Sequence, residues 1–221
     1  MTTFLLLRHS HSTANGAGIL AGQLAGITLS EIGLKQSNEI AQSLRPLNIN
    51  AIFSSPLERC LMTVQPLAQQ RKKRIQRLEG VIEMNYGDWS GRKLNELAKE
   101  KLWRRIQKTP SRVTFPNGES FVQASRRIER TLTSLSSKHP KSTILICSHG
   151  DVIKIAVQLT VGSELDRFQR IIIDPASLTT VEWNGSSRTL IATNQSLTSK
   201  PKKRMRKEIS SRRMLGGGSD V

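Results

Sequence analysis

Short apolar runs alternate along this chain with longer segments that mix polar and apolar residues. The apolar runs are continuous, which is typical of strands buried on both faces of a parallel sheet. Such runs cover residues 3–7, 50–53 and 143–147, and residues 74–78 form a weaker, more polar strand candidate. The mixed segments have helical spacing, and they cover residues 28–45, 55–71, 94–106, 121–135 and 151–160. This alternation predicts an α/β fold, a three-layer sandwich with a mainly parallel central sheet flanked by helices.

Local signals predict where several of these elements begin or turn. Thr28 and Glu31 have the spacing of a capping box at the start of a helix. In Ser55-Pro56-Leu57-Glu58, a serine suited to the N-cap precedes a proline and a glutamate, which favours a second helix start. Asn184-Gly185 predicts the turn of a closing hairpin between residues 177–183 and 188–193.

Composition changes near residue 196. Residues 1–195 are expected to form one globular domain, and residues 196–221 a basic, disordered tail without apolar periodicity. The formal charge of the 221-residue chain is +17, of which the tail contributes +6 from eight basic and two acidic residues. The remaining body is therefore also basic and favours anionic ligands. Phosphoester enzymes and nucleic-acid binders share this property, so charge alone does not choose between them.

The chain shows no signal for export or for a membrane span. The apolar run after Met1 is too short to cross a bilayer and lacks a basic segment and a cleavage site. Cys60 and Cys147 have no metal-ligand spacing, so we expect buried thiols in a reducing cytoplasm and no metal site. The sequence carries no signal for an oligomeric state.

Basic side chains follow three of the predicted strands. Arg8 and His9 come directly after the first strand, Arg59 lies one turn into the helix after the second, and His149 follows the run 143–147. In open α/β sheets, ligands bind beyond the carboxyl ends of the strands, where helix N-termini also attract anions. Two arginines and two histidines at one sheet edge predict a pocket for a dianion.

The residues around these positions resemble a known family. The chain is similar to the histidine phosphatase superfamily, in particular its phosphoglycerate-mutase-like branch, and the motifs occur in the order and spacing of that family. The motifs are Leu7-Arg8-His9-Ser10, Ser54-Ser55-Pro56-Leu57-Glu58-Arg59, Glu83 with Gly87-Asp88-Trp89-Ser90-Gly91, Gly118-Glu119-Ser120 and Ser148-His149-Gly150.

The resemblance implies a phosphomonoester hydrolase that works through a phosphohistidine and needs no cofactor. His9 would attack phosphorus, and Arg8, Arg59 and His149 would stabilise the charge of the phosphoryl oxygens. Glu83 matches the proton donor of the family. If Glu83 is not the donor, Glu119 and Asp151 are the next candidates, and His11 is expected at the pocket mouth or on a solvated loop. The substrate-binding residues are expected to be Asn15, Ser10 and Gly150.

Two positions depart from the family pattern. Ser10 stands where the family usually has glycine, which affects the backbone beside the nucleophile. A glutamine common in the following loop aligns with Gly22, so substrate contacts on that side do not carry over. The loops 16–26 and 93–116 are expected to determine which small phosphorylated metabolite is the substrate.

Two other functions remain open from the sequence. The first is a phosphoglycerate mutase that depends on 2,3-bisphosphoglycerate and has the same catalytic residues. Mutases usually have a longer insertion than the segment 92–117 found here, which favours a phosphatase. The second is a catalytically weak body whose basic run at 200–207 contacts nucleic acid weakly and without sequence preference.

Overall fold

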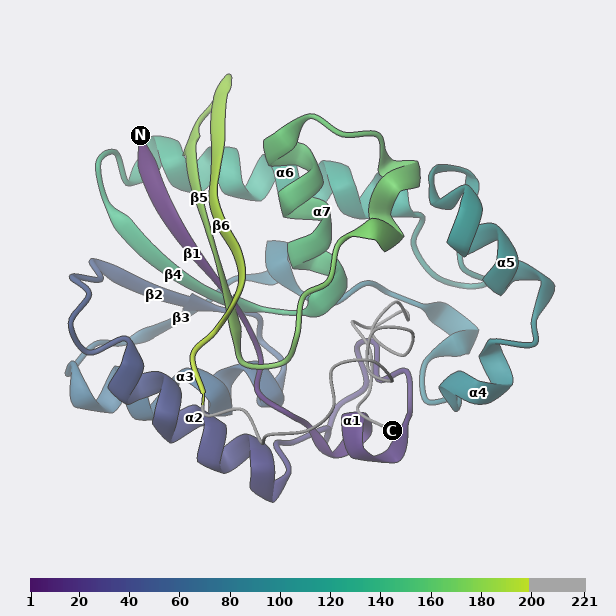
Figure 1. Cartoon of the computed structure of the whole chain (residues 1–221), viewed down its shortest axis with the longest axis horizontal. Helices are drawn as coiled ribbons and strands as arrows, with labels where there is room; N and C mark the ends of the chain where they lie inside the picture. The colour runs from purple at the N-terminus through teal and green to yellow at the C-terminus, as the bar shows by residue number, and fades with distance from the viewer. Residues whose placement is uncertain (199–221) are drawn as a thin grey trace.

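The strands form one mixed sheet in the computed structural model, which describes residues 1–198 (Figure 1). Its strand order is β3-β2-β4-β1-β5-β6. The strands are β1 (Thr2–Arg8), β2 (Ala51–Ser54), β3 (Ile75–Arg77), β4 (Thr143–Ser148), β5 (Ser177–Asn184) and β6 (Ser187–Ser196). The strands β1 to β4 run parallel to one another. At one edge of the sheet, β5 pairs antiparallel with β1 and β6 pairs antiparallel with β5, which forms the predicted hairpin.

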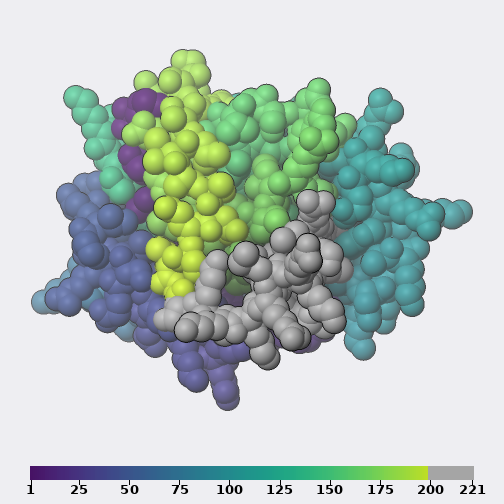
Figure 2. All heavy atoms as spheres, viewed as in Figure 1, coloured from purple at the N-terminus to yellow at the C-terminus, as the bar shows by residue number. Residues whose placement is uncertain are grey.

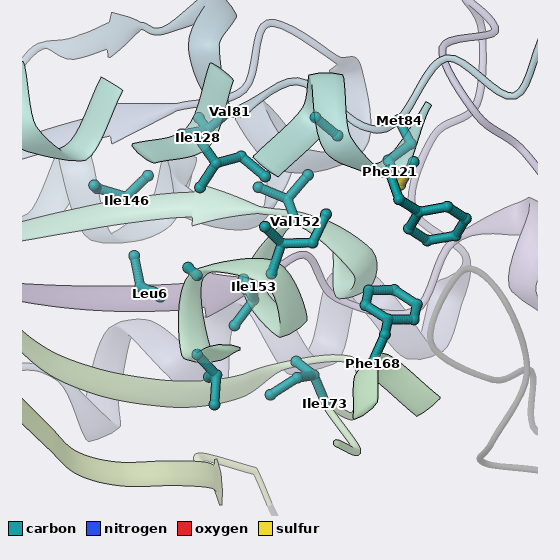
Figure 3. Packing of buried hydrophobic residues seen from close by; sticks show 14 of the residues in the cluster. Leu6, Val81, Met84, Phe121, Ile128, Ile146, Val152, Ile153, Phe168 and Ile173 are labelled. Carbon is teal, nitrogen blue, oxygen red and sulfur yellow. The ribbon is translucent and has the colours of Figure 1, made fainter. Parts of the chain in front are cut away.

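Helices cover both faces of this sheet. On one face lie α2 (Glu31–Ser43) and α3 (Glu58–Gln70), and on the other lie α6 (Phe121–Lys138) and α7 (Gly150–Val161) (Figure 1). The side chains of β1 alternate between two cores. Leu5 and Leu7 pack in the core on the side of α2 and α3. Leu6 packs instead with the core that includes Ile128 and Ile153 (Figure 3). The predicted three-layer α/β sandwich is confirmed.

Short elements surround the sheet edge where β1 and β4 end. They are α1 (Thr13–Ala17), η1 (Glu79–Val81), η2 (Gly87–Trp89), α4 (Leu94–Leu97), α5 (Lys101–Lys108), η3 (Pro110–Arg112) and η4 (Leu165–Arg170). The indole rings of Trp89 and Trp103 stack with centroids 6.3 Å apart, and Phe115 meets Trp89 edge-on at 5.6 Å. On the face seen in Figure 2, the edge strand β6 lies at the surface.

The single helix predicted over residues 94–106 is wrong. The chain instead forms α4 and α5, with an extended residue, Glu100, at the start of α5. Leu97 and Trp103 are both buried, but residues six apart lie about 120° apart around a continuous helix. The break at residues 98–100 allows both side chains to face the core.

Two predicted helix caps are also wrong. Leu29 is buried and bridges the backbone of Ser12, so the chain stays extended past Thr28, and Ser30 caps α2 by accepting from the N–H of Gly33. The N-cap of α3 is Leu57, with no side-chain hydrogen bond. The hydroxyl of Ser55 accepts a long hydrogen bond of 3.4 Å from the N–H of Leu57, and its shorter hydrogen bond is described below.

Other predictions concern the cysteines and the tail. Cys60 and Cys147 are both free and buried, as predicted. No helix in residues 1–198 is long and apolar enough to cross a membrane. From residue 199 onward the predicted disordered tail, including the basic run 200–207, lies outside the described residues. That part of the domain division therefore stays a prediction.

The contact of α2 with the loop after β1 generates a prediction about stability. A Cβ atom at Gly33 would overlap the backbone carbonyl of His11. We therefore expect Gly33→Ala to lower the free energy of unfolding by about 1–3 kcal/mol, measured by urea denaturation. Gln42→Ala, on the exposed side of the same helix, is the control and should change it by less than about 0.5 kcal/mol. Equal unfolding midpoints for the two variants would contradict this packing.

Candidate active site

The four basic residues predicted to form the pocket lie at the carboxyl ends of neighbouring strands. In the parallel pair of β1 and β4, Arg8 is opposite Ser148, so the histidine that follows each strand lies beside the other. The N–H of His9 donates to the carbonyl of Ser148 at 2.9 Å. The imidazole rings of His9 and His149 are 5.3 Å apart, centroid to centroid. All four basic side chains are buried.

The ring of His9 is held in one orientation. Its Nδ1 lies 2.7 Å from the backbone carbonyl of Ser10, and since a carbonyl only accepts, Nδ1 carries the proton. The lone pair is then on Nε2. Burial, followed by the positive charges of Arg59 and Arg8, holds the pKa of His9 well below its usual value. The ring is therefore neutral near pH 7, as a nucleophile must be.

The loop that provides this carbonyl is anchored to α3. The N–H of Ser10 donates to Oγ1 of Thr63 at 2.9 Å, and that hydroxyl donates to the carbonyl of Arg59 at 2.7 Å. The Ser10 hydroxyl is fully buried and has no hydrogen-bond partner among the described residues. Serine in place of the usual glycine is thus accommodated without a new hydrogen bond within this part of the chain.

Arg59 connects two sides of the site. Its Nη2 donates to the carbonyl of Gly22 at 2.7 Å and lies 3.2 Å from Nδ1 of His149. Its Nη1 is buried without a hydrogen-bond partner among residues 1–198. A buried guanidinium nitrogen without a partner is costly, and an anionic oxygen would satisfy it. On β1, Arg8 donates from Nη1 to the carbonyl of Ile173 at 2.7 Å.

His149 is also buried and neutral. Because arginine only donates, Nδ1 of His149 accepts from Arg59, and Nε2 pairs with the hydroxyl of Ser55 at 2.7 Å. Burial, then the charge of Arg59, holds the pKa of His149 well below its usual value. Ser55 was predicted as a helix cap and is instead the partner of this histidine.

Glu83 reaches the same group from the segment between η1 and η2. Its Oε1 accepts from the N–H of Met84 at 3.0 Å, and its Oε2 lies 3.8 Å from Nδ1 of His149. Burial first, and then the negative charge of Asp151, raise the pKa of Glu83 to about 7, against the opposing effect of Arg59. A carboxyl group with a pKa of about 7 is about half protonated at neutral pH, and its protonated form can serve as a proton donor.

The other predicted residues lie around this centre. The Oδ1 atom of Asn15 accepts from the N–H and hydroxyl of Ser12, so only its amide nitrogen remains to donate. Gly150 is the first residue of α7, which has no side-chain cap. His11 is 8% exposed, and its Nδ1 pairs with the hydroxyl of Ser30, so it is not a solvated loop residue.

Sequence reasoning missed several contacts near Glu83. Gly22 was taken as the position of the family's glutamine, but Gly22 contributes a carbonyl to Arg59, and the next residue, Gln23, donates to the carbonyl of Glu83 at 2.7 Å. Glu119 pairs with Arg127 at 2.7 Å. Within residues 1–198, no group of histidine, cysteine, aspartate or glutamate residues could hold a metal ion.

Known proteins resemble this chain in sequence and in fold. Phosphoserine phosphatase 1 of Hydrogenobacter thermophilus is 28% identical, over 88% of this chain and 92% of the relative. A probable phosphoglycerate mutase, GpmB, of Erwinia tasmaniensis is 27% identical, over 84% and 87%. The crystal structure of phosphoserine phosphatase from Entamoeba histolytica, in complex with 3-phosphoglyceric acid, superposes with a TM-score of 0.79 at 27% identity, covering 89% and 98%.

The family model of the histidine phosphatase superfamily (branch 1) matches residues 4–196. This range contains every motif on which the resemblance was based. The match confirms the predicted family and, with it, the predicted class of enzyme, a phosphatase of the histidine type. The chain belongs to the histidine phosphatase superfamily, branch 1.

Proposed function

We propose that this protein hydrolyses phosphate monoesters of small metabolites and that Nε2 of His9 carries the phosphoryl group between two half-reactions. The observation that carries this proposal is the His9 ring itself. It is neutral, its Nδ1 is fixed to the Ser10 carbonyl, and His149 lies across from it at 5.3 Å. No cofactor is needed for either half-reaction.

In the first half-reaction, Nε2 of His9 attacks phosphorus and forms an N–P bond. The P–O bond to the alcohol breaks, and the leaving alkoxide takes the proton of Glu83. In the second, Glu83 accepts a proton from water as the water oxygen attacks phosphorus. The N–P bond then breaks, phosphate leaves, and His9 and Glu83 are as they began.

The arginines and His149 would stabilise the charge on the transferred group. Arg59 can donate from Nη1, which has no other hydrogen-bond partner among the described residues, and Arg8 lies on the adjoining strand end. His149 can donate from Nδ1 in its other tautomer. Ser55 supports that tautomer because a hydroxyl can donate to Nε2 as well as accept from it. Such preorganised donors are worth about 3 kcal/mol each in comparable sites.

Three further residues are proposed to bind the substrate phosphate. Asn15 would donate from its amide nitrogen, and Gly150 from the backbone N–H at the start of α7, where the helix dipole favours an anion. The buried hydroxyl of Ser10, which has no protein partner within residues 1–198, would donate from the nucleophile's own loop.

The choice of phosphatase over mutase rests on the short segment 92–117, which lies between the loop of Glu83 and the Gly118-Glu119-Ser120 motif. Residues 92–117 contain only α4, α5 and η3, although the relatives include both named phosphatases and a probable mutase. We also propose a cytoplasmic location, which the two buried free thiols support. A nucleic-acid contact through residues 200–207 stays a prediction.

A panel of phosphomonoesters tests hydrolysis and the role of His9 together. We expect wild-type protein to release inorganic phosphate without 2,3-bisphosphoglycerate, and His9→Ala to lower kcat by at least about a thousandfold. His139→Ala, which alters a histidine at the end of α6, is the matched control and should retain full activity. Isomerisation of phosphoglycerate that requires the bisphosphate, without net phosphate release, would instead make the protein a mutase.

The proposed donor role makes a prediction about leaving groups. Glu83→Gln should lower kcat/KM for an alkyl ester such as phosphoserine by about a hundredfold or more, because the alkoxide must be protonated as it leaves. For p-nitrophenyl phosphate, whose phenolate leaves without a proton, the loss should be at least tenfold smaller. Equal losses for both esters in steady-state assays would show that Glu83 does not protonate the leaving group.

A further inference from the structure

A second cluster of charged and polar side chains is buried beside Glu83. The hydroxyl of Tyr86 donates to Oδ2 of Asp151 at 2.7 Å, and Nζ of Lys154 lies 3.3 Å from Oδ1 of Asp151. All three side chains are fully buried. Asp151 and Lys154 are in the first turn and a half of α7, directly after His149, and Tyr86 follows Glu83 by three residues.

The position of Lys154 calls for an explanation. Its ammonium group has no hydrogen-bond partner in the described chain, and beyond the ion pair with Asp151 it lies over the ring of Phe168, 4.8 Å from the centroid. Phe168 is part of the apolar core beside α7 (Figure 3). Burying an ion pair generally contributes less to folding stability than burying apolar residues of similar size at the same place, because both charges lose their hydration. Neither Asp151 nor Lys154 has a part in the phosphoryl transfer described above.

We propose that Asp151 is a positioning residue for this reaction: its carboxylate, held in place by the Tyr86 hydroxyl and by the ammonium group of Lys154, keeps Glu83 protonated and able to donate to the leaving group. The inference rests on the proposed function of Glu83 as the donor. In this inference, the buried cluster of Tyr86, Asp151 and Lys154 determines the protonation state of Glu83 when the substrate binds.

The charges around Glu83 make such a device necessary. Arg8 from β1 and Arg59 from α3 both favour the ionised carboxylate, as does the N–H of Met84. From α6, Arg127 donates to the carbonyl of Ile82, next to Glu83. The neighbouring His149 of α7 is neutral. Burial and the charge of Asp151 both raise the pKa of Glu83. Without Asp151, burial would be left to oppose the lowering of this pKa by the two arginines.

The charge of the buried site also matches the proposed ligand. Arg8, Arg59 and Lys154 are three buried cations, and Asp151 is one buried anion. With both histidines neutral and Glu83 protonated, these fully buried groups carry a surplus of two positive charges, equal in size to the charge of a phosphate monoester dianion; the half-buried Asp174 also acts on Arg8. If Glu83 were ionised, a dianion would meet an additional negative charge in a region of low dielectric constant.

The pH dependence of kcat/KM for phosphoserine tests the inference. The donor form of Glu83 exists below its pKa of about 7, so activity of the wild type should fall as pH rises through that value. Asp151→Asn removes the charge that favours protonation, and this alkaline limb should move toward acid by about one pH unit or more. Asp151→Asn/Lys154→Met leaves no unpaired buried charge and should shift the limb in the same direction, which separates tuning from loss of folding.

Two controls make the outcomes distinct. Glu164→Gln removes an exposed carboxylate that is paired with Arg167, outside the segment around Glu83, and its limb should stay at the wild-type pH. Glu83→Gln should abolish the limb. If the limb persists in Glu83→Gln, Glu83 is not the donor and the proposed function of this residue fails. If the limb is lost there but is unmoved in both Asp151 variants, Glu83 stands and the inference about Asp151 is overturned.

Discussion

The parallel pairing of β1 with β4 is the constraint on which the site depends. Arg8 lies opposite Ser148, so both strands end at the same level and the next residue on each is a histidine. The hydrogen bond from the His9 N–H to the Ser148 carbonyl fixes this level. A slip of one residue would turn every side chain of β1 to the opposite face. The imidazole rings of His9 and His149 would then lie apart, and they could not contact the same phosphoryl group.

Burial gives the acid and the base of the site their required forms by one physical effect. Loss of hydration disfavours any charged form, so it lowers the pKa of His9 and raises the pKa of Glu83. The His9 ring is consequently neutral, as the proposed nucleophile must be, and Glu83 is available in the protonated form that the proposed donor role requires. The same burial lowers the pKa of Arg8, but Glu83, Asp151 and Asp174 oppose that change, and a guanidinium group remains charged.

The sequence predicted what depends on local pattern and on strand order. The apolar runs gave the sheet and the residues that follow them gave the positions of Arg8, His9 and His149, because strand ends in a parallel sheet share an edge. Patterns could not show which partner a polar side chain takes. Ser55 has the spacing of a cap, yet its hydroxyl bonds His149, which follows the neighbouring strand β4 and is 94 residues away in sequence. The pair of Asp151 and Lys154 is invisible in sequence, since most charged residues on helices are exposed.

Trapping the phosphorylated enzyme tests the central claim most directly. Wild-type protein would be mixed with 32P-labelled substrate, quenched in alkali within milliseconds, and the labelled peptide characterised by mass spectrometry and by 31P NMR. The account predicts an acid-labile phosphoryl group on His9, attached at Nε2, because Nδ1 is held by the Ser10 carbonyl. A phosphoryl group at Nδ1, on His149, or on no residue at all during turnover would contradict it.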